Sequence, residues 1–116
     1  GKRDKLVYGN LESVRSIIDV RDIVEAYWIA VNKCDYGDEY NIGVEKSVTV
    51  GEFLDILLSN AKVKIPNEQD PKLLRRVDVT LQIPDVSKFE NKTGWKPKYS
   101  LNESIQFLLD YYRNII

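Results

Sequence analysis

Apolar residues recur at helical spacing in three segments of the chain, and each segment starts with a residue that can cap a helix. In all three, a glutamate stands three positions after the capping residue, which is the spacing of a capping box. The three predicted helices begin at Asp22, Thr49 and Ser100 and end near 32–34, at 59–60 and near 114, respectively. The apolar stripes that we expect to be buried on them are Ile23, Ala26, Tyr27, Ala30 and Val31; Phe53, Leu54, Leu57 and Leu58; and Leu101, Ile105, Leu108, Leu109 and Tyr112.

A fourth, shorter helix is predicted over 86–93. Asp85 can cap its start, and Gly94 follows its end, where a left-handed backbone conformation is favourable only for glycine. Trp95 is expected to be buried. Pro71 favours one helical turn in the polar loop before this helix.

Short β-prone runs lie between the helices. Strands are predicted at 6–8, 14–20, 39–43 and 63–65, with 39–43 as a buried, central strand. Strands and helices alternate irregularly and the strands are very short, so the fold class is α/β, with about four helices. This pattern does not fit a self-sufficient doubly wound sheet. It is typical of the part of an α/β enzyme that follows the main sheet. With 116 residues, we expect one domain at most, 1–116.

Composition narrows the class of partner. The net charge of −1 argues against a dedicated binder of nucleic acid or of a membrane surface, which needs a basic surplus. No apolar run approaches the ~18 residues of a membrane span. The one cysteine, Cys34, excludes an intramolecular disulfide and favours a reducing, cytoplasmic location.

Several catalytic motifs are missing from the sequence. It has no histidine, which removes the commonest general base and transition-metal ligand, and it has neither a glycine-rich dinucleotide fingerprint nor a phosphate-binding loop. None of the seven tyrosines has a lysine four residues later. We therefore predict no catalytic, cofactor-binding or metal-binding residue in this chain.

The candidate chemistry is concentrated in the loop 70–79. Arg75 and Asp78 lie there, and we expect them to clamp a phosphate-bearing ligand together with Arg15, because the planar arginine side chain donates two parallel hydrogen bonds to phosphate. Asp78 could orient Arg75 or accept hydrogen bonds from a ribose or base. The alternative for the loop is a set of surface salt bridges, and the alternative for Arg15 is a surface pair with Glu12 or Asp19.

Several linked motifs carry a family resemblance over essentially all 116 residues. In order, they are Gly9-Asn-Leu-Glu-Ser-Val-Arg15, Asp19-Val-Arg-Asp22-Ile-Val-Glu-Ala-Tyr, Tyr40-Asn-Ile-Gly43, Asp70-Pro-x-x-x-Arg75-x-x-Asp78-Val79, Asp85-x-Ser-Lys88 and Thr93-Gly-Trp-Lys-Pro97. They resemble the carboxyl-terminal half of extended short-chain dehydrogenases/reductases that modify nucleotide sugars. Within these enzymes, they look most like GDP-mannose 4,6-dehydratase and GDP-6-deoxy-4-keto-mannose reductase.

The resemblance implies roles for the three candidate residues. Arg15 and Arg75 resemble the arginines that contact the GDP diphosphate, and Asp78 resembles the acidic residue that contacts the nucleoside. Two positions depart from the family pattern: Ser16 replaces an aspartate and Arg76 replaces a proline. In the family, an amino-terminal Rossmann half carries NAD(P), a catalytic Ser/Thr and a Tyr-x-x-x-Lys pair.

The expected function is therefore the nucleotide-sugar-binding carboxyl-terminal lobe of an NAD(P)-binding Rossmann-type enzyme, either a GDP-mannose 4,6-dehydratase-like lyase or a reductase of deoxysugar biosynthesis. NADP or NAD belongs to the full-length parent, and this chain is predicted to be inactive alone. Without the missing amino-terminal half, apolar faces stand open, so we expect homo-oligomers or contact with a separate Rossmann half. The alternative is a stand-alone, non-catalytic module that binds a nucleotide sugar or another protein.

Overall fold

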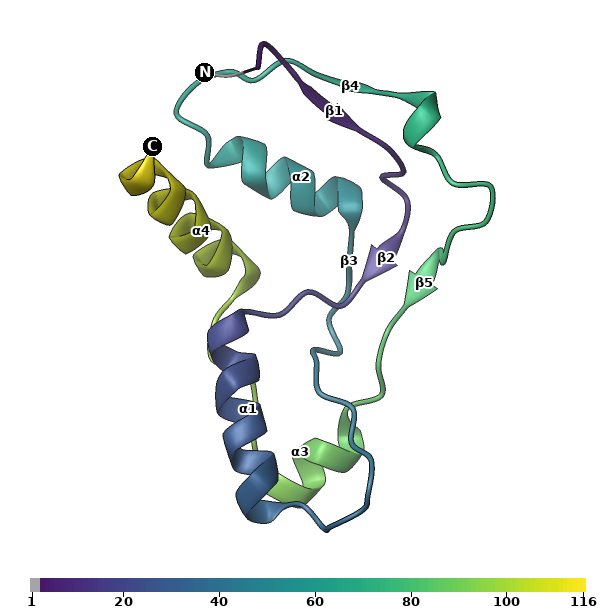
Figure 1. The fold of residues 1–116 in the computed structure, drawn as a ribbon, viewed down its shortest axis with the longest axis vertical. Helices are drawn as coiled ribbons and strands as arrows, with labels where there is room; N and C mark the ends of the chain where they lie inside the picture. Colours follow the sequence, from purple (N-terminus) through teal and green to yellow (C-terminus); the bar gives the residue numbers. More distant parts are fainter. Residues whose placement is uncertain (1–2) are drawn as a thin grey trace. The chain divides into compact units, whose positions relative to one another are not determined.

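The computed structural model describes residues 3–116 (Figure 1). Within that range, the elements in chain order are β1 (Leu6–Tyr8), β2 (Val14–Arg15), α1 (Val20–Lys33), β3 (Val48–Thr49), α2 (Val50–Ser59), β4 (Asn67–Gln69), a 3-10 turn (Pro71–Leu73), β5 (Leu81–Gln82), α3 (Ser87–Thr93) and α4 (Leu101–Ile115). The predicted α/β class with four helices and short strands is confirmed. The chain forms two compact units: unit 1 comprises the residues up to Arg15 and Val48–Gln82, and unit 2 comprises Ser16–Ser47 and Ile83–Ile116.

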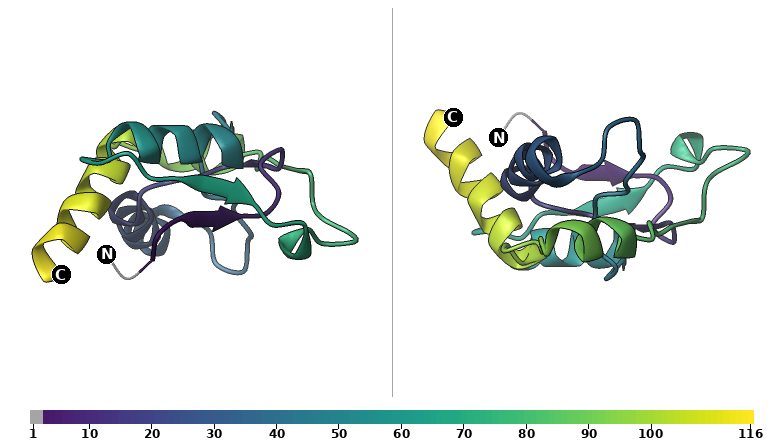
Figure 2. Two further views of the ribbon diagram at one scale, coloured as in Figure 1. Left: turned by 90° about the horizontal axis from the view of Figure 1, so that it is seen from above. Right: turned by 90° about the horizontal axis from the view of Figure 1, so that it is seen from below.

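Unit 1 is built on two small sheets. In the first, β1 and β4 run parallel, with Leu6 opposite Asn67. In the second, the order is β3-β2-β5, and β2 runs antiparallel to β3 and parallel to β5. Helix α2 lies on one side of the β1–β4 pair (Figure 2).

Helix α2 begins as the sequence predicts. The Thr49 side chain accepts a hydrogen bond from the Glu52 N–H, and the Glu52 carboxylate accepts one from the Thr49 N–H. These two bonds complete the capping box. The predicted apolar stripe, which includes Phe53, is half-buried.

Unit 2 is held together by a small aromatic core between α1 and α3. Ala26, Phe89 and Trp95 are buried, and the Phe89 and Trp95 rings meet edge to face with centroids 5.6 Å apart. Gly94 ends α3 with a φ of 71°, as its position in the sequence predicts. Helix α4 has the predicted capping box at Ser100, and the structure places its last helical residue at Ile115.

The predicted start of α1 is wrong by three residues. The helix is capped by Asp19, whose side chain accepts a hydrogen bond from the Arg21 N–H. Asp22 lies inside the helix and is fully buried, where its two carboxylate oxygens accept hydrogen bonds from the N–H groups of Lys98 and Tyr99, each at 3.1 Å. These two hydrogen bonds to Asp22 therefore determine which face of α1 points inward.

Because Asp22 points inward, part of the apolar stripe that was predicted to be buried on α1 is exposed. Tyr27 and Val31 are 61% and 75% exposed, and Val20, Val24 and Trp28 lie on the same outer face. Ala26 on the opposite face is buried. On α4, Ile105 is buried as predicted, whereas Leu108 and Tyr112 are exposed.

Three strand predictions also require correction. The strand predicted over 14–20 stops at Arg15, and 39–43 has no sheet partner in the described chain; Asn41 donates instead to the Asp85 carbonyl. The strand predicted over 63–65 lies four residues later, at β4, because the hydrogen bonds of Leu6 to Pro66 and of Asp70 to Tyr8 set the register with β1. Strand formation depends on these distant partners more than on β-branched residues.

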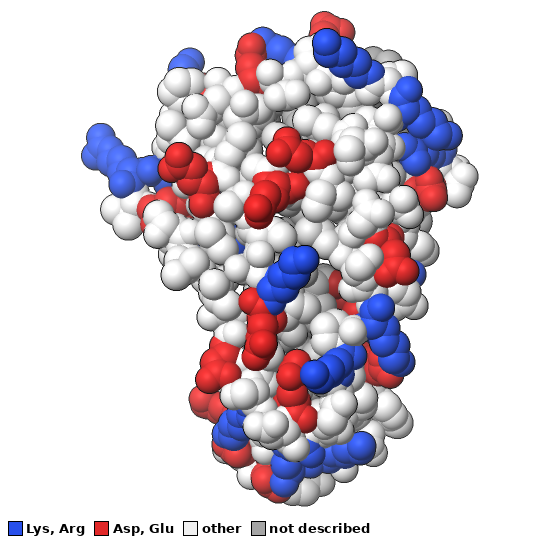
Figure 3. All heavy atoms as spheres, turned by 180° about the vertical axis from the view of Figure 1, so that it is seen from behind, with Lys and Arg blue, Asp and Glu red and all other residues white. Residues whose placement is uncertain are grey.

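No described helix is both long and apolar enough to cross a membrane. On the face seen in Figure 3, side chains of both charges are interspersed. Neither the positive nor the negative side chains form a continuous patch on that face.

Candidate functional site

The loop that carries the candidate residues is anchored at its start to the end of β1. The Asp70 N–H donates to the Tyr8 carbonyl, and the Gln69 amide donates to the Gly9 carbonyl at 3.0 Å. A Cβ atom on Gly9 would lie 3.0 Å from the Leu73 carbonyl oxygen, so the close approach of the 3-10 turn favours glycine at position 9. The turn itself is the one predicted at Pro71.

Asp78, farther along this loop, is the centre of a polar cluster. Its Oδ2 accepts hydrogen bonds from the Asn10 amide at 3.1 Å and from the Ser13 hydroxyl at 3.3 Å. Its Oδ1 faces Nη2 of Arg15 at 3.7 Å. These contacts lower the pKa of Asp78, chiefly through the Asn10 hydrogen bond, so the carboxylate is ionised at neutral pH.

Arg15 reaches this cluster from β2, where it pairs with Gln82 of β5. Its Nη1 donates to the Val14 carbonyl at 2.9 Å, and the 3.7 Å approach to Asp78 is an ion pair but too long for a hydrogen bond. Within residues 3–116, no other acceptor takes its remaining donors. The guanidinium is therefore held in place with most of its hydrogen-bonding capacity unused.

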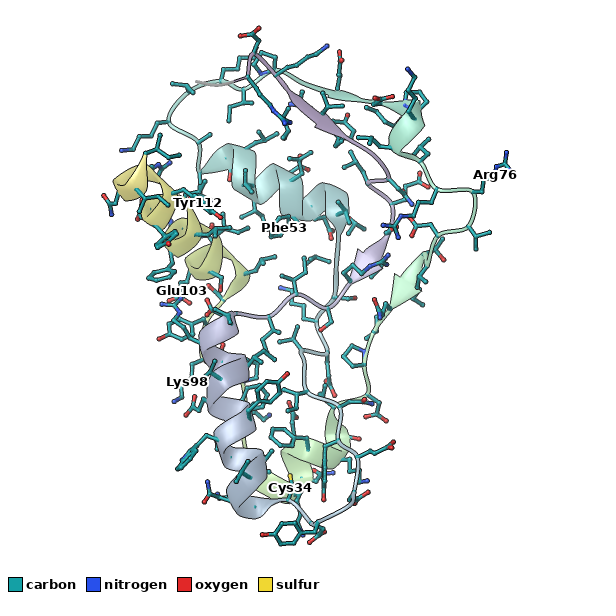
Figure 4. All side chains as sticks on the ribbon, viewed as in Figure 1. Cys34, Phe53, Arg76, Lys98, Glu103 and Tyr112 are labelled. Atoms are coloured by element: carbon teal, nitrogen blue, oxygen red, sulfur yellow. The ribbon has the colours of Figure 1, made fainter. Side chains whose placement is uncertain are left out.

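Arg75 lies three residues before Asp78 in the loop. Its side chain is exposed and makes no ion pair or hydrogen bond within the described part of the chain. Asp78 pairs with Arg15 and not with Arg75, so the predicted orienting contact is to the other arginine. Neighbouring Arg76 extends from the outer edge of the loop into solvent (Figure 4).

The structure thus brings together two of the three predicted residues, Arg15 and Asp78. The surface-pair alternatives for Arg15 are not observed: Asp19 pairs with Arg21 instead, and Glu12 makes no ion pair among the described residues. Ser16, which departs from the family pattern, bonds reciprocally to the backbone of Val44.

Sequence reasoning missed Asn10 and Ser13 as members of this site. Asn10 also shapes the local turn, because its Oδ1 accepts a hydrogen bond from the Glu12 N–H. The available indication was the position of both residues in the Gly9–Arg15 motif, between the turn and the candidate arginine.

Charged residues in unit 2 are paired differently. Lys88 donates to the Asp38 carboxylate at 2.6 Å and to the Glu39 carbonyl at 2.9 Å, beside an open pocket of about 490 Å³. Lys92 donates to both carboxylate oxygens of Asp35. Across residues 3–116, no cluster of three or more potential metal-ligating side chains is present.

The family model described as GDP-mannose 4,6 dehydratase matches residues 1–108. The chain belongs to this family. It is 26% identical over 106 residues to GDP-6-deoxy-D-mannose reductase of Pseudomonas aeruginosa, with 91% of this chain and 35% of the reductase covered. It is 30% identical over 112 residues to GDP-mannose 4,6 dehydratase 1 of Arabidopsis thaliana, with 95% of this chain and 31% of the dehydratase covered.

The fold of this family member also matches solved structures. The Pseudomonas aeruginosa protein RMD, solved in complex with NADPH, superposes with a TM-score of 0.88 at 23% identity, covering 97% of this chain and 37% of that protein. The predicted resemblance and the Rossmann-type α/β class are confirmed. The chain spans about a third of the length of the curated relatives that it matches.

Proposed function

We propose that this chain is the nucleotide-sugar-binding part of a GDP-mannose 4,6-dehydratase-like or GDP-6-deoxy-mannose reductase-like enzyme. In this proposal Arg15 and Arg75 bind the diphosphate and Asp78 binds a hydroxyl or base of the nucleoside. The observation that carries it is the arrangement of Arg15 and Asp78, a held guanidinium with free donors beside a carboxylate that stays ionised.

The chemistry of this pair suits a ligand with two kinds of group. The free N–H groups of Arg15 match the oxygens of a phosphate, and the ionised Asp78 accepts hydrogen bonds from hydroxyl or N–H donors. Exposed Arg75, three residues before Asp78, supplies a second cation in the proposal. A nucleoside diphosphate presents both groups on one molecule.

These 116 residues supply binding in the proposal, and the residues that carry out the reaction lie outside them. The sequence contains no Tyr-x-x-x-Lys pair and no dinucleotide fingerprint. NADP or NAD is assigned to a Rossmann half. The chain alone is expected neither to bind NADP nor to convert GDP-mannose, and turnover by the purified 116-residue chain would contradict this part of the proposal.

The outer face of α1 is the proposed contact for a partner polypeptide. Val20, Val24, Tyr27, Trp28 and Val31 form an exposed apolar stripe on it, whereas the inward face carries the buried Asp22. Exposed stripes of this kind favour association. Light scattering should show self-association, or a complex once a Rossmann half is added; a clean monomer at high concentration, with no binding to that half, would contradict the contact.

Calorimetric titration tests the binding proposal. GDP and GDP-mannose are expected to saturate the wild-type chain, and the double variant Arg15→Ala/Arg75→Ala should show no saturation. Arg76→Ala is the matched control, because it removes an adjacent positive charge outside the proposed contacts. No heat of binding at millimolar ligand would overturn the proposal and favour a protein-interaction module.

A further inference from the structure

Asn10 and Ser13 surround the carboxylate of Asp78 although they lie 68 and 65 residues away in the sequence. Ser13 is buried, with 2% of its surface exposed. The Asn10 amide nitrogen donates both to the Ser13 hydroxyl at 2.9 Å and to Asp78 at 3.1 Å. These residues therefore hold the carboxylate from the interior side of unit 1.

The hydrogen bonds of this cluster are consistent with one arrangement of donors and acceptors. Asn10 Oδ1 accepts from the Glu12 N–H, so the amide nitrogen must be the atom that faces Ser13 and Asp78. The Ser13 oxygen accepts from Asn10 and directs its own hydrogen to Asp78. Both residues act on Oδ2 and leave Oδ1 on the side of Arg15.

The segment that carries this pair is fixed to the start of α2. The Val50 N–H donates to the Ser13 carbonyl and the Gly51 N–H donates to the Leu11 carbonyl, each at 2.9 Å. The first N–H groups of a helix have no partner within the helix, so they are available for such bonds. Next to it, the Val14 N–H donates to the Thr80 carbonyl at 2.8 Å, which ties the segment to the chain just after Asp78.

We propose that Asn10 and Ser13 are positioning residues that set the orientation of Asp78 and, through it, of Arg15 for nucleotide binding. This inference rests on the proposed function. The two residues need not touch the ligand. Their hydrogen bonds fix one carboxylate oxygen so that the other keeps the guanidinium of Arg15 directed to the ligand while its donors stay free.

Two substitutions at Asn10 separate positioning from a local turn role. Asn10→Asp keeps an oxygen that can accept from the Glu12 N–H but places a second carboxylate against Asp78. Asn10→Ala removes both functions. If Asn10 serves only the turn, Asn10→Asp should bind GDP like the wild type; if it positions Asp78, Asn10→Asp should weaken GDP binding by about tenfold or more, at least as much as Asn10→Ala.

The experiment is calorimetric titration of GDP into the full chain, with Asn67→Asp as the control for an added carboxylate on unit 1. Asn67 is exposed on β4, and its side chain bonds only to the nearby Ile65 carbonyl among the described residues. Ser13→Ala should also weaken GDP binding, whereas Ser59→Ala, at an exposed serine of α2, should not. Circular dichroism spectra matching the wild type confirm that each variant is folded. Wild-type binding with an unchanged Asn10→Asp affinity overturns the positioning role alone; absence of wild-type binding overturns the proposed function and this inference with it.

Discussion

Two arginine–aspartate pairs in this chain have the same chemistry but different surroundings. In unit 2, Arg21 forms two parallel hydrogen bonds with Asp19, at 2.9 and 2.8 Å, and its guanidinium lies over the rings of Tyr99 and Phe107, 3.7 and 4.1 Å from their centroids. Ser104 of α4 adds a third side-chain bond to the carboxylate, at 2.6 Å. This pair joins the start of α1 to α4, and its hydrogen bonds are satisfied within the protein.

The Arg15–Asp78 pair in unit 1 is loose by comparison. Its closest charged atoms are 3.7 Å apart, and among residues 3–116 the guanidinium makes one hydrogen bond, to the neighbouring Val14 carbonyl. Asp78 is held by uncharged donors. The number of arginine hydrogen-bond donors that the fold leaves unused distinguishes the two pairs. It is small in the structural ion pair and large in the candidate ligand site.

The largest effect is expected from Asp19→Ala. This change removes the cap of α1 and one partner of the satisfied pair, and we expect the free energy of unfolding to fall by about 3 kcal/mol, at the low end for buried pairs because a third of the Arg21 side chain is exposed. Urea denaturation measures it. Asp78→Ala should cost clearly less stability; equal losses would remove the distinction between the pairs.

Acid should weaken the same pair without mutation. The hydrogen bond from Arg21 holds the pKa of Asp19 far below its ordinary value of 3.8. A lowered pKa contributes stability that is present above the ordinary value and is lost as pH falls through the lowered one. The melting temperature should therefore decline as pH falls below about 4, and this decline should be shallower in Asp19→Asn than in the wild type. Identical slopes would argue against the strength of this pair.

Arg15→Ala addresses the other pair. We expect GDP affinity to fall by about tenfold to a hundredfold, because charge-assisted bonds to phosphate are lost, with little change in melting temperature. Calorimetry and thermal denaturation measure the two quantities. Arg21→Ala should have the opposite effects: a lower melting temperature, and a nearly unchanged GDP affinity when it is measured below that temperature.

The smallest effect is expected at the exposed loop. Arg75→Ala should weaken GDP binding by about threefold to tenfold, and Arg76→Ala by less than about twofold, because an exposed arginine loses more freedom on binding than a held one. Equal effects of the two substitutions would show that only the total charge of the loop matters.

Local sequence spacing was sufficient for much of this fold. The capping boxes at Thr49 and Ser100 and the glycine at position 94 were predicted correctly, because each depends on contacts within a few residues. The start of α1 was not, because the role of Asp22 depends on backbone donors 76 and 77 residues away. The absent strand at 39–43 has the same cause, since a strand requires a partner that the local sequence does not specify.

The site was predictable to a similar degree. The arginine and aspartate residues could be proposed from their chemistry and from the family resemblance, and two of them do meet. Asn10 and Ser13 could not be assigned, because their contacts with Asp78 span more than sixty residues of chain. Asparagine and serine are also common turn residues, so their residue types alone do not indicate a site.

The most direct test of the central claim is to follow the side-chain Nε–H signals of the arginines by NMR while GDP is added to the wild-type chain. We expect the signals of Arg15 and Arg75 to shift and saturate together, whereas that of Arg21, already bonded to Asp19, stays in place. Unmoved signals for Arg15 and Arg75 at millimolar GDP, or a shift of Arg21 alone, would contradict the claim.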